Sequence, residues 1–504
     1  MSVKVFSVDQ IRQGDAFTIS NEPIKSIDLM ERAAKKCADW ISGRSTEHAF
    51  KIFCGMGNNG GDGTAIARIL QDDFIKVMVY IVHTHDKYSD DGMNNLTKLE
   101  AHYPEFIQHI FTETDIPAID SDDILVDAIF GSGLSRPITG LGAAIINQMN
   151  ESKAVIISID IPSGLYADHS SILSKGAIVQ ADYTLSFQTP KLAFFLPEND
   201  IYVGEWTLLD IKIHPDYLLS TPTHYYLLTK DDIKPRLRQR TRFSHKGIYG
   251  HALLIAGSKG KTGAAILSAH ATLRSGAGLV TVHLPEDATT PMQTALPEVM
   301  ISYDRSKEAF SHLPDVSPYS AIAIGPGLGQ RPETATALKL LIQESRVPLL
   351  FDADAINIIS ENKTWLSFLP PGCIFTPHLK EFERLTGATT DGFERLKMQQ
   401  EFSVRYKCYV VLKGAFTSIS TPEGITYFNP TGNPGMATGG SGDVLTGIIL
   451  GLLTQHYTPL DAALLGVYLH GSAGDIAAGN LGVDTLIASD IIENLGNAFK
   501  AFTD

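Results

Sequence analysis

The sequence predicts an α/β protein of two three-layer domains, each a mostly parallel sheet with helices on both faces. Short apolar runs of strand length alternate with longer helical patterns along most of the chain. Polar or glycine-rich motifs follow these runs, at the strand ends where parallel sheets bind ligands. The length of 504 residues is too great for a single hydrophobic core.

The first half begins with two helical patterns at residues 9–42, separated by a break at Pro23. Five apolar runs then predict strands: KIFC from residue 51, VMVYIV from 77, ILVDAIF from 124, AVIISIDI from 154 and YTLSF from 183. Strands that alternate with helices indicate a Rossmann-like, doubly wound sheet.

The motif GMGNNGGDG, residues 55–63, directly follows the first predicted strand. Its glycines match a dinucleotide-binding fingerprint, but the second strand ends in His83–His85 and lacks the acid that would hold a ribose. A standard redox dinucleotide domain is therefore not predicted. The unusual feature is the cluster of side-chain amides and a carboxylate in Asn58–Asp62.

Oxygen-bearing side chains lie at three neighbouring strand ends. Asn59 follows the first strand, Asp127 lies in a later one, and Asp160 and Ser163 follow the next. Asn59, Asp127 and Ser163 carry little net charge, which suits an alkali cation better than zinc or a transition metal. Asp160 remains as a candidate acid or base. The alternative for Asp127 is that its carboxylate only caps a loop.

The combination GMGNNGGDG, DAIFGSGLSRP and DIPSGL resembles the NAD(P)H-hydrate epimerase domain, over roughly Val8–Ile213. The resemblance implies that Asn59, Asp127 and Ser163 bind potassium, and that Asp160 moves the protons that invert carbon 6 of the hydrated ring. It also implies residues that bind the hydrated nucleotide, namely Asn58, Asn59, Gly60, Gly61, Asp62, Gly131, Ser132, Gly133, Leu134, Ser135, Arg136, Pro137 and Asp160.

The stretch around residues 214–226 contains two prolines and loses the strand–helix rhythm. We expect a linker there, between a first domain at 1–213 and a second at 227–504. Alternating basic residues follow, from Lys234 to Lys246. A solvated connector is preferred here over an anion-binding strip, because charge runs are usually exposed faces.

Six apolar runs predict the strands of the second half: HALLIAGS from residue 251, GLVTVHLP from 278, AIAIGPG from 321, PLLFDAD from 348, CIFTPH from 373 and YVVLKG from 409. The sequence GSKGKTGAA is not a P-loop, because Ile255 stands where that loop needs glycine. Of Asp352 and Asp354, Asp354 is the expected helix cap. An alternative for His378 is a buried histidine that pairs with backbone.

The stretch NPGMATGGSGDVLT, residues 433–446, joins a glycine loop to an apolar helix. Glycines let backbone N–H groups approach a ligand, and a helix N-terminus favours phosphate oxygens. Because like charges repel, Asp443 is better placed to take a proton from a hydroxyl beside a phosphoryl group than to bind the phosphate. The alternative is that Asp443 is only an N-cap.

The glycine loop and following helix resemble the ribokinase-like fold. The motifs HKGIYGHALLIAGS, GAGLVTV, GPGLG, TPHLKE, LKGAFT and NPGMATGGSGD are similar to its NAD(P)H-hydrate dehydratase branch, over roughly Leu227–Phe502. One departure is Leu379-Lys380, where the family often has Pro-Gly. The resemblance implies that Asp443 is catalytic and that ADP is the co-substrate, although the residues do not separate ADP from ATP, and Mg²⁺ is expected with its phosphates. The implied contacts to the hydrated nucleotide are Ala264, Gly327, His378 and Asp443, and those to ADP or AMP are Lys413, Gly414, Ala415, Phe416, Thr417 and Gly442.

The composition of the chain argues against several classes of binding partner. The formal charge of −15 argues against general binding to nucleic acid or anionic membranes. The four cysteines form no C-x-x-C pair, and the first residues lack a signal-peptide core. No apolar run reaches about 18 residues, the length of a membrane span. We expect a cytoplasmic homo-oligomer whose partners are small molecules.

The sequence therefore predicts a bifunctional enzyme that repairs hydrated NADH or NADPH, an isomerase in its first half and a lyase in its second. Two alternatives remain open. A small-molecule kinase, such as a hydroxymethylpyrimidine or pyridoxal kinase, would share the second fold. The first domain could also be a nucleotide-sensing or protein-binding module without activity.

Overall fold

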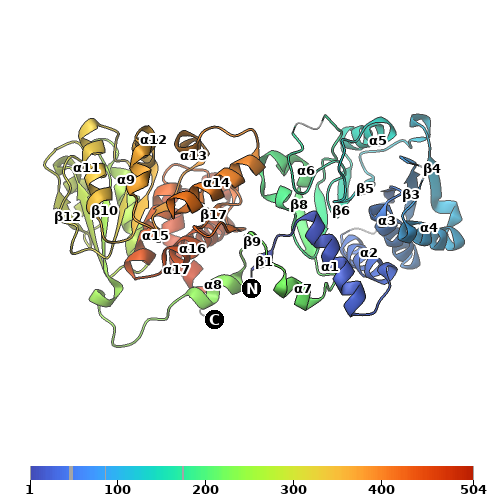
Figure 1. Cartoon of the computed structure of the whole chain (residues 1–504), viewed down its shortest axis with the longest axis horizontal. Coiled ribbons are helices and arrows are strands. Elements are labelled where there is room, and N and C mark those ends of the chain that lie inside the picture. Colours follow the sequence, from blue (N-terminus) through green and yellow to red (C-terminus); the bar gives the residue numbers. More distant parts are fainter. Residues whose placement is uncertain (1, 45–48, 86, 173–174, 503–504) are drawn as a thin grey trace. The chain divides into compact units, whose positions relative to one another are not determined.

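The computed structural model describes residues 2–44, 49–85, 87–172 and 175–502. These residues form two compact units (Figure 1). The N-terminal unit comprises Lys4–Thr223 with Asp391–Phe393, and the C-terminal unit comprises the remaining described residues. The expected linker at 214–226 contains helix α7 (Pro215–Ser220), in the first unit, and strand β9 (Tyr225–Leu227), in the second.

The N-terminal unit is built on a parallel sheet of seven strands in the order β4-β3-β2-β5-β6-β7-β8. The strands are β2 (Phe50–Cys54), β3 (Val77–Val82), β4 (Ile107–Ile110), β5 (Ile124–Ala128), β6 (Val155–Ile159), β7 (Tyr183–Phe187) and β8 (Glu205–Leu209). All five predicted strands are present, whereas β4 and β8 are edge strands whose polar or half-exposed residues hide the pattern. The strand order reverses between β2 and β5, which makes this the expected ligand site.

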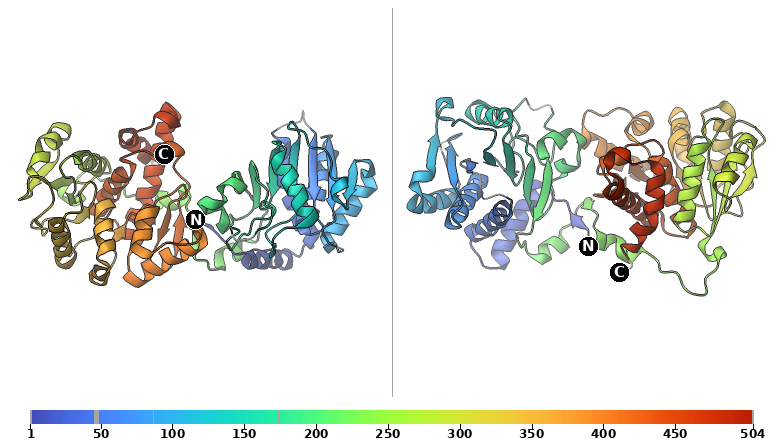
Figure 2. Two further views of the ribbon diagram at one scale, coloured as in Figure 1. Left: turned by 90° about the horizontal axis from the view of Figure 1, so that it is seen from above. Right: turned by 180° about the vertical axis from the view of Figure 1, so that it is seen from behind.

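Helices pack on both faces of this sheet (Figure 2). They are α1 (Val8–Asn21), α2 (Ser26–Ser42), α3 (Asn58–Asp72), α4 (Asp90–His102), α5 (Gly140–Glu151), α6 (Asp200–Val203) and α7. Consecutive residues of β2 point into different cores: Ile52 packs with α2, α3 and α4, and Phe53 packs with α5. The predicted break at Pro23 is confirmed, because it lies between α1 and α2.

The C-terminal unit carries a sheet of eleven strands in the order β1-β9-β18-β17-β16-β15-β14-β13-β10-β11-β12. Its strands are β1 (Val3–Lys4), β9, β10 (His251–Ile255), β11 (Leu279–Leu284), β12 (Met300–Tyr303), β13 (Ala321–Ile324), β14 (Leu349–Phe351), β15 (Ile374–Phe375), β16 (Tyr409–Leu412), β17 (Ser418–Ser420) and β18 (Thr426–Phe428). The six predicted strands are confirmed as β10, β11 and β13 to β16, which lie in a parallel block with β12. The hairpin of β17 and β18 is antiparallel.

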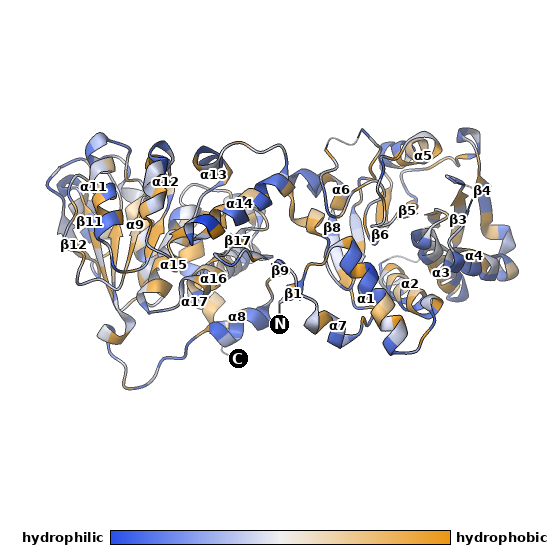
Figure 3. Cartoon of the chain, in the orientation of Figure 1, coloured by the Kyte–Doolittle hydropathy of each residue, from blue (hydrophilic) through white to orange (hydrophobic). Residues whose placement is uncertain are grey.

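Two helical layers cover this sheet, and its strands are hydrophobic on both faces (Figure 3). The helices are α8 (Lys230–Ile233), α9 (Thr262–Arg274), α10 (Thr289–Ala295), α11 (Pro332–Glu344), α12 (Ala353–Glu361), α13 (Leu379–Thr386), α14 (Gly392–Tyr406), α15 (Ser441–Thr454), α16 (Pro459–Leu481) and α17 (Ala488–Lys500). One core joins α9, α10 and α15 to α17, and the other joins α11 to α14. Among the described residues, no helix is long and apolar enough to cross a membrane.

The basic run at 234–246 uses several of its charges within the protein. Arg236 pairs with Asp461 of α16. Arg238 donates to the carbonyl oxygens of Gln455 and His456, each at 3.1 Å, just beyond the end of α15. A cation at a helix C-terminus stabilises the carbonyls that lack partners there. These arginines therefore fasten a connector to the domain.

Candidate active sites

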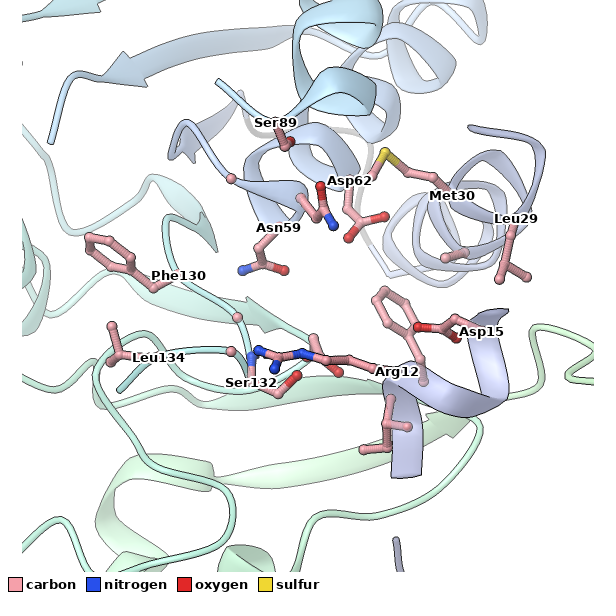
Figure 4. Close-up of a pocket in the computed structure, with 18 of the residues that line it drawn as sticks. Arg12, Asp15, Leu29, Met30, Asn59, Asp62, Ser89, Phe130, Ser132 and Leu134 are labelled. Carbon is pink, nitrogen blue, oxygen red and sulfur yellow. Dashed lines mark hydrogen bonds between the residues drawn. The ribbon is translucent and has the colours of Figure 1, made fainter. Parts of the chain in front are cut away.

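A cavity of about 910 Å³ lies at the switch point of the N-terminal sheet (Figure 4). Its walls come from the residues that follow β2, β5, β6 and β7, and from helices α1 and α2. The sequence-predicted residues that line it are Asn58, Asn59, Asp62, Gly131, Ser132, Gly133, Leu134, Ser135, Arg136, Pro137 and Asp160. The cavity thus brings together motifs about 100 residues apart in the chain, as expected where parallel strands end.

The NNGGD motif forms the first turn of α3, and Gly57 is its N-cap. The free N–H groups and partial positive charge of this helix end favour an anionic ligand. Gly60 and Gly61 serve packing: a Cβ on Gly60 would lie 1.8 Å from the carbonyl oxygen of Gly55, and one on Gly61 would lie 3.0 Å from Met30. Glycine is required here because helix and strand end approach so closely.

Asp160 follows β6 and has a positive φ of 66°, a strained conformation typical of functional sites. Its Oδ1 accepts a hydrogen bond from Lys191 Nζ at 2.5 Å, and its Oδ2 accepts one from the Ser132 N–H at 3.2 Å. Burial alone would raise the pKa of Asp160, but Lys191 and Ser132 outweigh it and lower the pKa below its ordinary value. Asp160 is therefore ionised, as a base must be.

Lys191 is a site residue that sequence reasoning missed. It lies in the loop after β7, its side chain is 1% exposed, and it also donates to Ser186 Oγ at 2.8 Å. A buried lysine needs a partner, and Asp160 supplies one. A signal was present, because Lys191 is the single charged residue between Asp182 and Glu198.

The three side chains expected to bind a cation differ in their hydrogen-bond partners. Asp127 is fully buried and accepts hydrogen bonds from the hydroxyls of Ser158 and Ser163 and from the N–H groups of Ile129 and Ser163. It thus binds the loop that carries Ser163, as its loop-capping alternative expects. Asn59 is buried, and both polar atoms of its side-chain amide lack a partner among the described residues. The Ser163 hydroxyl accepts a hydrogen bond from the Phe130 N–H at 2.8 Å and donates to Asp127, so of the three side chains only Asn59 has an oxygen without a partner among the described residues.

In the C-terminal unit, Asp443 lies in the first turn of α15. The alternative that it is only an N-cap is wrong, because Gly440, with a φ of 94°, is the capping residue. The Asp443 carboxylate accepts no hydrogen bond from a residue that the structure describes. Burial, followed by the charge of Asp352, raises the pKa of Asp443 to about 7. It can therefore take up a proton near neutral pH.

Lys413 and Asp352 form an ion pair whose charges act on Asp443. Lys413 Nζ donates to Asp352 Oδ1 at 3.0 Å, and Thr446 and Thr376 donate to the same carboxylate at 2.8 and 2.9 Å. Burial alone would lower the pKa of Lys413, but Asp352 and other carboxylates raise it, so the ammonium stays charged. A Cβ on Gly442 would lie 3.3 Å from Lys413 Nζ, which brings two predicted nucleotide contacts together.

The remaining predicted contacts lie at neighbouring strand ends. A Cβ on Gly327 would lie 3.1 Å from that of Ala264, so these two are adjacent. His378 caps α13, accepts a hydrogen bond from the Lys380 N–H through Nδ1 and pairs with Glu381 at 3.2 Å. Its side chain is 49% exposed, so the buried-histidine alternative is wrong.

The expected nucleotide residues 413–417 join β16 to β17. Within this turn the Gly414 N–H donates to the Thr417 hydroxyl, which in turn donates to the Gly414 carbonyl oxygen. Ala415 and Phe416 lie between them. These bonds fix a tight turn after the strand that ends beside Lys413.

The start of the glycine loop is tied to α16 by a residue that sequence reasoning missed. Asp475 accepts hydrogen bonds from the Gly432 N–H and from Asn433 Nδ2, each at 2.9 Å. A Cβ on Gly474 would lie 2.2 Å from Met436 Sδ, so helix and loop are in close contact. Asp475 therefore positions the loop without belonging to its motif.

The expected cap of α12 needs correction. Asp352, not Asp354, is the N-cap residue, although its side chain makes no capping bond. Asp354 instead accepts hydrogen bonds from the Gly329 N–H and Gln330 Nε2, each at 2.8 Å, and pairs with Lys261 at 3.3 Å. Its function is to hold the GPGLG loop against α9.

Comparison with known proteins identifies the family of each half of the chain. The family model described as YjeF-related protein N-terminus matches residues 26–193, and the model described as NAD(P)H-hydrate dehydratase matches 252–497. The bifunctional NAD(P)H-hydrate repair enzyme Nnr of Moorella thermoacetica is 36% identical over 96% of this chain and 94% of its own length. The enzyme of the same name from Thermofilum pendens is 33% identical over 100% of this chain and 97% of its own.

Among solved structures, a ribokinase-like superfamily protein from Enterococcus faecalis V583 is 30% identical, with a TM-score of 0.50, and the match covers 56% of this chain and 98% of that one. This agrees with the ribokinase-like fold expected for the C-terminal unit. On the full-length similarity to the Moorella protein, the chain belongs to the family of bifunctional NAD(P)H-hydrate repair enzymes.

Proposed function

We propose that the domain at 1–213 interconverts the R and S epimers of hydrated NADH or NADPH, and that the domain at 227–504 dehydrates the S epimer. The second step consumes ADP and gives AMP and phosphate. Family membership supports the pair of activities. The observation that carries the dehydratase assignment is the free carboxylate of Asp443, whose pKa is raised to about 7 beside Lys413 and the glycine loop.

In the dehydratase site, Asp443 would take the proton of the ring hydroxyl as the oxygen attacks the terminal phosphoryl group of ADP. Lys413 and the N–H groups at the start of α15 would stabilise charge on that group. Phosphate then leaves carbon 6 with the electron pair of the C–O bond, carbon 5 loses a proton to solvent, and the ring double bond forms again. Ala264, Gly327 and His378 are proposed to hold the hydrated nucleotide. We propose Mg²⁺ with the ADP phosphates, where it would neutralise charge, because Mg²⁺ binds mainly through phosphates and few carboxylates.

In the epimerase site, Asp160 would exchange protons with the hydrated ring, and Lys191 would keep it ionised. The first turn of α3 and the loop 131–137 are proposed to hold the rest of the nucleotide. We also propose K⁺ at Asn59, Asp127 and Ser163, because the side-chain oxygen of Asn59 is buried and has no partner among the described residues. When bound, the ion would satisfy the buried amide oxygen and fix the strand-end loops.

One assay tests both activities. The purified chain is given a mixture of R and S hydrates of NADPH, with ADP, with ATP or with neither, and the reduced-nicotinamide absorbance is followed. We expect full recovery with ADP and release of phosphate, and we expect replacement of K⁺ by choline to slow only the use of the R epimer. No recovery with either nucleotide, or a stable phosphorylated product in place of free phosphate, would contradict the proposal.

A further inference from the structure

Helix α1 brings another carboxylate, that of Asp15, to the N-terminal cavity. Figure 4 shows Asp15 on α1 near Leu29, on the side of the cavity away from Phe130 and Leu134. Asp160 reaches the same cavity from the end of β6. The two carboxylates therefore come from different walls. A ligand that fills the cavity would lie against both.

Asp15 has no structural partner that would explain its position. It is half-buried, and its carboxylate makes no hydrogen bond or ion pair with any residue that the structure describes. Asp9, on the same helix, is the contrasting case: its side chain is 84% exposed and lies 3.6 Å from Arg12. Carboxylates held out of water without a counter-ion are concentrated at functional sites, because their desolvation costs stability.

The charged groups around Asp15 set its proton affinity. Asp62 on α3, Asp160 after β6, Lys191 after β7 and Arg12 on α1 all line or adjoin the cavity. Burial, followed by the charge of Asp160, raises the pKa of Asp15 to about 6, and Lys191 opposes the rise. Burial also raises the pKa of Asp62 well above its ordinary value. Asp160 stays ionised, whereas Asp15 gains and loses a proton near neutral pH.

We propose that Asp15 is the second proton-transfer residue of the epimerase site and acts on the ring face opposite Asp160. This inference rests on the proposed function. Carbon 6 carries both a hydroxyl group and ring nitrogen N1, so it can invert by opening of the ring without oxidation. A single base is insufficient, because the hydroxyl loses its proton on one face of the ring and the oxygen must regain a proton on the other.

The step balances with two carboxyl groups. Asp160 takes the hydroxyl proton, the C6–N1 bond breaks with its electron pair moving to N1, and carbon 6 becomes a carbonyl carbon. After rotation about C5–C6, N1 bonds to the other face of this carbonyl, and the oxygen takes a proton from Asp15. The reverse reaction uses the two groups in exchanged roles, and proton exchange with water restores the starting state. The pair starts and ends the reaction with one proton and holds two while the ring is open, when the substrate carries the negative charge on N1.

The test uses the full chain with Asp15→Asn, Asp15→Glu and, as the matched control on the same helix, Asp9→Asn. We expect Asp15→Asn to lower kcat for epimerisation by about 10²-fold or more, the usual contribution of a general acid or base. Asp15→Glu should retain much of the activity and Asp9→Asn all of it. ADP-dependent dehydration of pure S hydrate should stay unchanged in every variant, which reports that the chain has folded.

The pH profile separates catalysis from packing. In the wild type, kcat should fall as pH rises through about 6, because Asp15 then loses its proton, and Asp15→Asn should lack this limb. Epimerisation by Asp15→Asn within threefold of wild type, or an unchanged limb, would overturn the inference. The inference would also be overturned if the fall in kcat near pH 6 were lost in Asp62→Asn and kept in Asp15→Asn. If Asp15→Asn does not fold, the pH profile of the wild type and the epimerisation rate of Asp15→Glu test the inference. A wild type without any epimerisation would reject the proposed function itself.

Discussion

Asp160 and Asp443 are comparable carboxylates in the two units, since each is partly or largely buried with the charge of a lysine nearby, yet they are in opposite states. Lys191 contacts Asp160 directly and holds its pKa below the ordinary value. Lys413 donates instead to Asp352, and the pKa of Asp443 is raised to about 7. Burial acts on both aspartates in the same direction. An aspartate that its lysine contacts directly therefore stays ionised, whereas one whose lysine contacts another carboxylate titrates near neutral pH.

Among tests of this comparison, the largest effect is expected from Asp443→Asn. We expect dehydration of the S hydrate to fall by about 10²–10⁴-fold, the range for loss of a general base. Epimerisation should continue at the wild-type rate, because the other cavity is untouched. Stopped assays that separate the epimers check both rates. Dehydration within tenfold of wild type would remove Asp443 from its proposed role.

Lys191→Met should have the next largest effect. Without the ammonium, only Ser132 opposes the effect of burial and the pKa of Asp160 should rise, so the base is protonated at higher pH. We expect the rate of epimerisation to fall by about 10²-fold near pH 7. The acid limb of the pH profile should shift to higher pH, so the difference in rate from the wild type should become smaller as pH rises. Loss of one member of a buried ion pair should also cost about 3–5 kcal/mol of unfolding free energy.

Measurement of kcat against pH, together with urea unfolding, checks this prediction. The contribution of the Asp160–Lys191 pair to stability should be present above the unfolded pKa of an aspartate, about 4, and be lost as pH falls through the lowered folded value. Lys191→Arg keeps the charge and serves as the control. An unshifted acid limb in Lys191→Met would show that Lys191 does not set the state of Asp160.

Asp352→Asn tests the other half of the comparison. Removing this charge should lower the pKa of Asp443, since Asp352 is the charge that raises it, and should release Lys413 from its hydrogen bond. The rising limb of dehydration against pH, near 7 in the wild type, should move to lower pH. We expect a decrease of about tenfold at the optimum, from the loss of a charged hydrogen bond. A limb that stays in place would contradict the assignment.

The smallest effect is expected from Asp475→Ala, because Asp475 touches the glycine loop and not the reacting groups. Loss of its two hydrogen bonds should loosen the loop and lower kcat/KM for ADP by roughly tenfold, equivalent to about 1–2 kcal/mol. Steady-state kinetics with varied ADP check this, with Asn480→Ala, exposed on the same helix, as the control. Equal effects of the two variants would refute a positioning role.

The sequence predicts the strands and the strand-end motifs well, and the reason is local. Apolar runs such as ILVDAIF identify a buried strand wherever it lies in the sheet. The order of parallel strands then brings Asn59, Asp160 and the 131–137 loop to one cavity. Edge strands β4 and β8 escape notice because one face contacts solvent and the apolar run is interrupted.

The residues that escape prediction act over long separations in the chain. Asp15 and Asp475 each look like a polar position on a helix. Folding brings Asp15 to the same cavity as Asp160, 145 residues away in the chain, and brings Asp475 to Gly432, 43 residues away. For the same reason, Asp354 does not take its expected role as a helix cap. Local rules predict a cap, whereas the contacts with Thr446 and Gln330 that decide each role come from distant segments.

The most direct test of this account follows the fate of each epimer in Asp160→Asn, given an equal mixture of R and S hydrates with ADP. If the two aspartates serve separate reactions, the S hydrate should be converted at the wild-type rate, recovery should then stop near half, and the R hydrate should remain. Consumption of the R hydrate as fast as in the wild type, or loss of S conversion in this variant, would contradict the division of labour between the two sites.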